Sequence, residues 1–260
     1  MPSDILGIDI GGSSIKAAPV DTGTGSILAQ PKQVSLPESP VPDMICEAIG
    51  GIVEHFDWRG PLGCGYPGVV RNGIACSAAH VADAWLGVNL ESRLREQTGA
   101  TVRVINDADA AGLAEMRFGA GRDHYHADGG TVLMFTLGTG IGSALFRDGR
   151  LFPNTEFGHV YMKEGIEGED MAAAAVRVRE GLSWDVWGLR VNRFLEEMNK
   201  LLSPDLVIIG GGVSENFSKF GSYLKACPEI VPAKMGNKAG IIGAALALTL
   251  HFSNPTPDEK

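Results

Sequence analysis

The sequence of 260 residues contains one strand–glycine turn–strand pattern twice, and this repeat limits the folds that are open to the chain. An apolar run at 6–10 ends in a pair of glycines and is followed by a returning strand at 15–20. A second apolar run at 131–137 ends in a glycine-rich turn and is followed by a returning strand at 143–146. Two copies of one unit predict two similar α/β lobes with a cleft between them.

The segments around these units predict further helices and strands in a layered arrangement. The strand pattern at 101–105 runs directly into a helical pattern, which is typical of a βα unit. Asn89 and Gly99 have the positions of an N-cap and a C-terminal stop for one helix. Repeated prolines across 31–42 indicate an extended loop. Helices are predicted at 43–56, 90–98, 108–118 and 239–250, with a long one ending before Pro204, and buried strands at 62–70 and 206–209.

We place the boundary between the lobes near 119–121, because a glycine-containing segment there separates the two repeated units. Residues 1–119 then form a smaller N-terminal α/β lobe, and residues 120–260 form a larger C-terminal α/β lobe. The last helix, at 239–250, is a candidate to pack back toward the N-terminal lobe.

Glycine makes up 35 of the 260 residues, which is well above the usual ~7%. We expect these glycines to lie in folded turns, where bare backbone amides can bind phosphate oxygens. A single turn of this kind more often indicates a tight hairpin without a ligand. Two turns in matching places, with the hydroxyls of Ser13, Ser14 and Thr139 beside them, favour a site that holds one phosphate chain from both sides.

Composition and charge exclude several classes of protein. The net charge of −9 argues against a nucleic-acid-binding surface. The four cysteines form no CxxC pair, which argues against a zinc or disulfide framework and favours a reducing, cytoplasmic compartment. The apolar run at 239–250 is too short to cross a bilayer, so no membrane partner is expected. A P-loop is absent, and the formal GxGxxG match at 63–68 continues as strand or turn instead of opening a helix.

Four side chains are candidates for chemistry, and each has an alternative interpretation. Asp9, at the end of the first strand, can bind Mg²⁺ or stabilise a turn. Asp107, where a strand meets a helix, is by itself more typical of an N-cap. Glu156 and His159 are three residues apart in a turn, where they can bind adjacent hydroxyls of a sugar. A lone histidine is more often structural.

Four short motifs occur in this order along the chain: DIGGSSIK at 9–16, NDADAAG at 106–112, LGTGIG at 137–142 and EFGH at 156–159, supported by GGGVS at 210–214. Together they resemble the sugar kinases of the ROK (repressor, open reading frame, kinase) family. The closer match is to the polyphosphate glucokinase branch of that family. The resemblance covers about residues 5–250, and the order and spacing of the motifs carry it more than any single one.

This resemblance implies a two-lobe hexokinase/actin-like (ribonuclease H-like) fold and phosphoryl transfer to the 6-hydroxyl of a sugar. It implies that Asp107 is the general base and that Asp9 helps to hold Mg²⁺. It also implies a homodimer. The implied sugar-binding residues are Asn106, Glu156, His159, Gly68 and His80. The implied phosphate-binding residues are Gly11, Gly12, Ser13, Ser14, Lys16, Thr139 and Gly140, with Gly211 and Gly212 near the adenosine if ATP is the donor.

Departures from the family pattern leave parts of the function open. Many members carry a Cys-rich zinc loop after the EFGH-type motif, but 160–171 contains no cysteine, so no zinc is expected. His80 stands where the branch usually has Asn, which leaves open the choice between glucose, mannose and related hexoses. The donor is expected to be polyphosphate, ATP or both. The alternatives are an ATP-only hexose kinase and a non-catalytic sugar sensor. The presence of Asp9 and Asp107 argues against the sensor, which would need neither residue.

Overall fold

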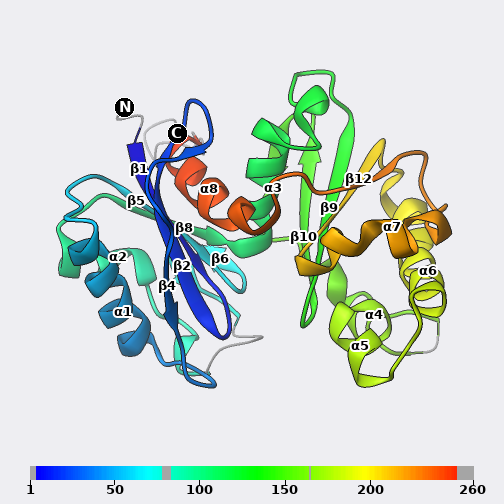
Figure 1. Cartoon of the computed structure of the whole chain (residues 1–260), viewed down its shortest axis with the longest axis horizontal. Coiled ribbons are helices and arrows are strands. Elements are labelled where there is room, and N and C mark those ends of the chain that lie inside the picture. The colour runs from blue at the N-terminus through cyan, green and yellow to red at the C-terminus, as the bar shows by residue number, and fades with distance from the viewer. Residues whose placement is uncertain (1–3, 78–82, 164, 251–260) are drawn as a thin grey trace, which may run out of the picture.

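The computed structural model describes residues 4–77, 83–163 and 165–250, and it contains two β-sheets with helices between and outside them (Figure 1). The first sheet has the order β3-β2-β1-β5-β8, with β4 also paired to β2. Its strands are β1 (Asp4–Ile10), β2 (Ser14–Asp21), β3 (Ser26–Ile27), β4 (Lys32–Ser35), β5 (Leu62–Tyr66) and β8 (Val102–Asn106).

The second sheet repeats this topology with the order β11-β10-β9-β12-β13. In each sheet an antiparallel hairpin, β1–β2 or β9–β10, is followed by a parallel partner of its first strand, β5 or β12. The predicted repeat and the two α/β lobes are therefore confirmed. The strands of the second sheet are β9 (Thr131–Leu137), β10 (Ile141–Arg147), β11 (Arg150–Phe152), β12 (Leu206–Gly210) and β13 (Ile230–Pro232).

Helices lie on both sides of each sheet. In Figure 1, α1 (Pro42–His55) and α2 (Leu90–Thr98) lie outside the first sheet, and the long helix α6 (Trp184–Leu202) lies outside the second. Between the sheets lie α3 (Asp107–Phe118) and α8 (Ala239–Leu246), which pack against each other. The shorter helices are α4 (Gly168–Ala172), α5 (Ala174–Arg179) and α7 (Phe217–Phe220). No helix among the described residues is long and apolar enough to span a bilayer.

The two central helices lie against both lobes. Helix α3 continues directly from β8 of the first sheet and packs against β10 of the second sheet as well as β5 of the first, whereas α8, at the end of the described chain, packs against β1 and β5 of the first. A buried apolar cluster that contains residues of both helices and both sheets fills the space between them. Burial of this shared layer favours folding of the two lobes together.

Glycines make the contact of α8 with the first sheet close. A side chain at Gly63 would overlap the backbone of Ala244, and one at Gly7 would overlap the carbonyl of Ile241. The expectation that the surplus glycines lie in turns is therefore incomplete, because some lie inside strands and helices at this interface. A glycine in a strand marks close approach of another backbone as well as a turn.

Most predicted elements are present, with three corrections. Helix α2 is capped as predicted, since the side chain of Asn89 accepts from the Ser92 amide and Gly99 ends the helix in the left-handed region. The loop predicted across 31–42 contains strand β4, which pairs with β2. The strand predicted at 62–70 ends at Tyr66, and a short hairpin of β6 (Val70–Arg71) and β7 (Ile74–Ala75) follows. The last helix is α-helical only to residue 246 and ends in a 3₁₀ turn.

Candidate active site

Two adjoining cavities lie where the glycine turns of the two sheets face each other. The larger has a volume of about 660 Å³ and the smaller about 180 Å³, and Asp107, Thr136 and Gly211 line both. The larger is also lined by the predicted site residues Gly11, Gly12, Ser13, Gly68, Asn106, Thr139, Gly140, Glu156 and His159. The smaller is lined by Asp9, Lys16 and Gly212.

Among the described residues, Ser14 is the predicted site residue that lines neither cavity; its carbonyl accepts from the Gly11 amide at 2.9 Å and closes the first turn. His80 lies outside the described residues. The basic side chains of Arg117, Arg122, His124 and His126, near the end of α3 and after it, also line neither cavity. Arg117 instead lies over the ring of Tyr125, 5.2 Å from its centroid.

The second glycine turn leaves its backbone open to the cavity. The Gly138 amide donates to the carbonyl of Gly140 at 3.0 Å, which closes a tight turn between β9 and β10. Gly138 lines the larger cavity, and a methyl group added at this residue would meet no atom within 4 Å. The missing side chain therefore leaves room for a ligand against the turn, as expected for a phosphate-binding loop.

The junction of β8 and α3 places Asp107 where the two cavities meet. The preceding residue, Asn106, is the N-cap of α3: its side chain accepts from the Asp109 amide at 2.9 Å and donates to the Gly68 carbonyl at 3.2 Å. The interpretation of Asp107 as the N-cap is therefore wrong. Asp107 is the first residue of α3, where its Oδ1 accepts from the Ala108 amide at 2.8 Å while the residue lines both cavities.

The environment of Asp107 suits an acid–base group. Burial, together with the nearby carboxylates of Asp9 and Glu156, raises the pKa of Asp107 to about 7, although its hydrogen bond from the Ala108 amide opposes the shift. A general base is most effective when its pKa lies near the working pH. The site therefore holds a carboxyl group that changes its protonation state near neutrality.

Asp9 lies deep in the smaller cavity, on β1 opposite Lys16 of β2. Burial raises its pKa, while the charge of Lys16 opposes this effect. The first turn of α8 packs against the carboxylate so closely that a side chain at Gly240 would lie 2.5 Å from the Asp9 Cγ. Asp9 and Asp107 thus bring two carboxylates to one small cavity, and carboxylate oxygens are the protein ligands that Mg²⁺ takes. The donor set fits this ion.

The opposite wall carries Glu156, His159 and Glu169, which all line the larger cavity. Glu156 Oε2 lies 4.0 Å from His159 Nε2, and burial raises the pKa of Glu156. Glu169 Oε2 accepts from the Ile141 amide at 3.1 Å, so this carboxylate is fixed to the start of β10. The sequence interpretation missed Glu169; its signal was the acidic run at 167–170, which follows the EFGH motif.

The sequence interpretation also missed Asn154, which connects the two lobes. Its side chain accepts from the Val70 amide at 2.8 Å and donates to the Val70 carbonyl at 2.9 Å. The backbone amide of Asn154 donates to Asp109 Oδ2 at 2.8 Å. Asn154 has a φ of 61°, in the left-handed region that Asn tolerates better than most residues. This contact joins the loop before Glu156 to the N-terminal lobe.

The sequence profile of the ROK family matches residues 5–181, more than half of the chain. The chain belongs to the ROK family. It is 42% identical over 243 residues to a polyphosphate glucokinase of Mycobacterium tuberculosis (strain CDC 1551 / Oshkosh), which covers 93% of this chain and 90% of that protein. The resemblance noted in the motifs, including the branch, is thus confirmed.

Solved structures of this family have the same architecture. An inorganic polyphosphate/ATP-glucomannokinase from Arthrobacter sp. strain KM matches with a TM-score of 0.89 at 40% identity, covering 95% of this chain and 99% of that chain. A ROK family glucokinase from Streptomyces griseus, in complex with glucose and AMPPNP, matches with a TM-score of 0.78 at 25% identity, covering 93% and 98%. The predicted two-lobe, hexokinase-like fold is confirmed.

Proposed function

We propose that this protein is a kinase that transfers the terminal phosphoryl group of inorganic polyphosphate, ATP or both to the 6-hydroxyl of glucose. The observation that carries the proposal is the position of Asp107. This residue lines both cavities. The larger also carries the acids and histidine proposed to bind the sugar and the glycine turns proposed to bind phosphate, and the smaller carries Asp9 and Lys16. A carboxyl group with a pKa of about 7 at that junction suits proton transfer at neutral pH.

The proposed reaction needs one proton transfer and one exchange of P–O bonds. The oxygen of the 6-hydroxyl forms a bond to the terminal phosphorus while the bond from phosphorus to the leaving phosphate oxygen breaks. Asp107 accepts the hydroxyl proton as the new bond forms. Phosphoryl transfer depends mainly on positioning and charge stabilisation. We assign positioning of the phosphate chain to the amides of the turns at Gly11 and Gly138, with Ser13, Thr139 and Lys16 beside them.

We propose Mg²⁺ as the cofactor and Asp9 as its protein ligand, with Asp107 nearby. When bound, the ion would neutralise negative charge on the donor phosphates. Support comes from the two acidic side chains that line the smaller cavity. Burial raises the pKa of Asp9, as expected for a carboxylate whose charge is only partly balanced by Lys16.

The relatives support the choice of substrates. The mycobacterial relative is named a polyphosphate glucokinase, and the Arthrobacter structure is described as a polyphosphate/ATP-glucomannokinase. We therefore propose glucose as the acceptor and test mannose beside it. Gly211 and Gly212 are proposed to lie beside the adenosine when ATP is the donor. A homodimer, a cytoplasmic location and a zinc-free site remain predictions from the sequence.

The test is formation of sugar 6-phosphate by the purified protein with Mg²⁺. Glucose and mannose are each combined with ATP and with polyphosphate, and Asp107→Asn is measured beside the wild type. We expect glucose 6-phosphate with polyphosphate or with both donors, and almost none from the variant. Product with ATP alone would remove polyphosphate from the proposal. Sugar binding without product from any pair would instead indicate a sensor.

A further inference from the structure

We propose that Glu167 is a positioning residue that holds the imidazole of His159 in one orientation, with Nδ1–H bound to Glu167 and Nε2–H presented to the sugar. This inference rests on the proposed function, since it concerns how the same site binds its sugar. Glu167 does not line either cavity, whereas His159 lines the larger one. Glu167 therefore acts on the ligand only through His159.

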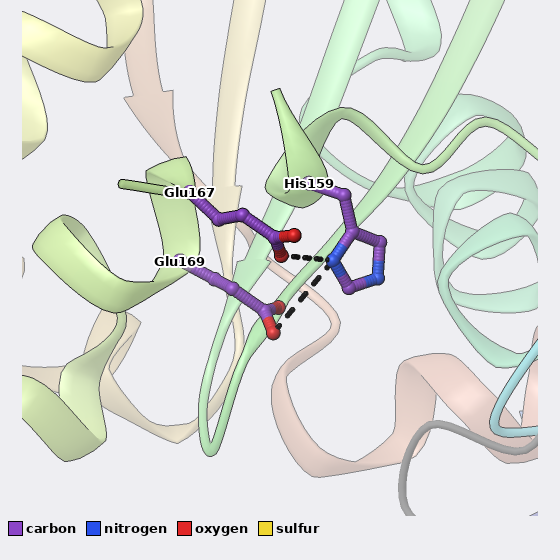
Figure 2. A group of neighbouring side chains, drawn as sticks. All are labelled: His159, Glu167 and Glu169. Atoms are coloured by element: carbon purple, nitrogen blue, oxygen red, sulfur yellow. Dashed lines mark hydrogen bonds and ion pairs between the residues drawn. The ribbon is translucent and has the colours of Figure 1, made fainter. Parts of the chain in front are cut away.

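The geometry at the histidine is directional. Glu167 Oε2 lies 2.6 Å from His159 Nδ1, which is the length of a strong, charge-assisted hydrogen bond. Figure 2 shows the carboxylates of Glu167 and Glu169 on the same side of the ring, both directed at Nδ1. The nearest carboxylate oxygen of Glu169 is farther away, at 3.9 Å. The other ring nitrogen, Nε2, lies toward Glu156, at 4.0 Å.

The local fold explains how Glu167 reaches the histidine. The chain leaves His159, turns back in a short hairpin, and returns with Glu167 opposite Tyr161 in a β-bridge. The Gly168 amide donates to the Val160 carbonyl at 2.9 Å, which fixes the two ends of the hairpin beside each other. Glu167 is then the last residue before α4. The acid is thus held by backbone hydrogen bonds, and only its side chain contacts His159.

The charges around His159 favour the imidazolium form. The hydrogen bond to Glu167 raises its pKa most, and the charges of Glu169, Glu167 and Glu156 raise it as well, while burial opposes them. The carboxylates come from the segment before the 3₁₀ turn of His159 and from the start of α4. An imidazolium held at Nδ1 has Nε2–H as its free donor. One sugar hydroxyl can then donate to Glu156 and accept from Nε2–H, which is a charge-assisted bond.

This arrangement makes sugar binding dependent on pH in a defined direction. The pKa of His159 is raised, so the imidazolium is complete at low pH and is lost as pH rises through that value. Removal of the Glu167 charge lowers the pKa, and Nε2–H is then lost at a lower pH. Sugar affinity should therefore begin to fall at a lower pH in a Glu167→Gln variant than in the wild type.

The experiment measures glucose affinity by calorimetry from pH 6 to pH 9 and the His159 nitrogens by ¹⁵N NMR, on the full-length protein. For Glu167→Gln we expect the falling limb of affinity to move to lower pH. Between the two midpoints, affinity should be about 10-fold weaker, as for loss of one charge-assisted hydrogen bond. Glu167→Asp, which keeps the carboxylate, should lie between wild type and Glu167→Gln. Asp170→Asn removes the same charge from an exposed residue of α4 and should leave the wild-type profile unchanged.

The outcomes separate this inference from the proposed function. If wild type binds glucose and Glu167→Gln has the same pH midpoint and the same ¹⁵N titration of His159, Glu167 does not position the histidine. If Asp170→Asn moves the midpoint as far as Glu167→Gln, a general charge effect replaces the specific one. If the wild type binds neither glucose nor mannose at any pH, the proposed function fails and the inference fails with it. The inference is supported if the His159 titration and the falling limb of glucose affinity both shift in Glu167→Gln and neither shifts in Asp170→Asn.

Discussion

The two walls of the cavity come from lobes of the same topology, yet they offer different chemistry. The N-terminal wall contributes Asp9 and Asp107, buried carboxyl groups whose pKa values burial raises. The C-terminal wall contributes Glu156 and His159, which lie on a loop and interact with further carboxylates. The repeated hairpin thus places backbone amides on both sides of the cavity, while the side chains around each hairpin determine the chemistry of its wall. We assign phosphoryl transfer to the N-terminal wall and sugar recognition mainly to the C-terminal wall.

The largest expected effect comes from removing the charge of the N-terminal wall. Asp107→Asn should lower kcat by about 10²–10⁴-fold, the usual contribution of a positioned general base. Glucose affinity measured by calorimetry should stay close to wild type, because the sugar-binding wall is intact. The thermal unfolding midpoint at pH 8 should be equal or higher, since ionisation of Asp107 is unfavourable in the folded state. Near-normal turnover of this variant would contradict the assignment of phosphoryl transfer to the N-terminal wall.

The pH profile of the wild type should report the same carboxyl group. The pKa of Asp107 is raised to about 7, so the group is protonated below that pH and cannot accept a proton. We therefore expect kcat/KM to fall as pH decreases through about 7, approaching tenfold for each further pH unit. Initial rates at saturating donor from pH 5.5 to pH 8.5 measure this limb. A flat profile down to pH 5.5 would remove the catalytic role of Asp107.

The next effect concerns how the two lobes hold their central helices. Gly63→Ala should lower the free energy of unfolding by roughly 2–3 kcal/mol, because the new methyl group overlaps the rigid backbone of α8. Gly112→Ala, in α3, meets side chains of the second sheet at 2.8 Å instead, and should cost only about 1 kcal/mol or less once the gain in helix propensity is included.

Gly51→Ala is the matched control for this pair, since Gly51 is an exposed residue of α1 with nothing within 4 Å of the added methyl group. This variant should be as stable as wild type or gain up to about 1 kcal/mol. Urea unfolding followed by circular dichroism measures all three. Equal losses for Gly63→Ala and Gly112→Ala would mean that the two helix–sheet contacts are alike.

A smaller effect is expected from opening the connection between the walls. Asn154→Gly removes the two side-chain hydrogen bonds to Val70 but keeps a residue that accepts the φ of 61°. The free energy of unfolding should fall by about 1–2 kcal/mol. Because these hydrogen bonds hold the loop before Glu156 against the N-terminal lobe, KM for glucose should rise several-fold while kcat changes less. An unchanged KM in a destabilised protein would make Asn154 purely structural.

The smallest expected effect is on the second phosphate turn. Gly138→Ala adds a methyl group where no atom lies within 4 Å, so stability should be unchanged in thermal unfolding. The methyl group projects into the cavity and should raise KM for the phosphoryl donor a few-fold, with KM for glucose unaffected. Steady-state kinetics with each substrate varied in turn separates these two constants. A rise in the glucose KM alone would place the turn on the sugar side.

Local pattern was enough to predict much of the fold. The alternation of apolar runs and glycine turns located both hairpins, and Asn89 with Gly99 located both ends of α2. The motif residues Asn106 and Asp107 were found, but local pattern did not show which of them caps α3, since either type of residue can cap a helix. In the structure Asn106 is the cap, because its side chain binds the amide of Asp109 as well as the carbonyl of Gly68.

The two hairpins, their glycine turns and the presence of suitable acids could be predicted from residues a few positions apart in the chain. Only the folded chain brings Asn154 to Val70, 84 positions earlier, and Gly63 to Ala244. The fold also returns Glu167 to Nδ1 of His159 through the hairpin between them. Such contacts depend on the packing of segments that are distant along the chain, and no local periodicity records which segments will meet.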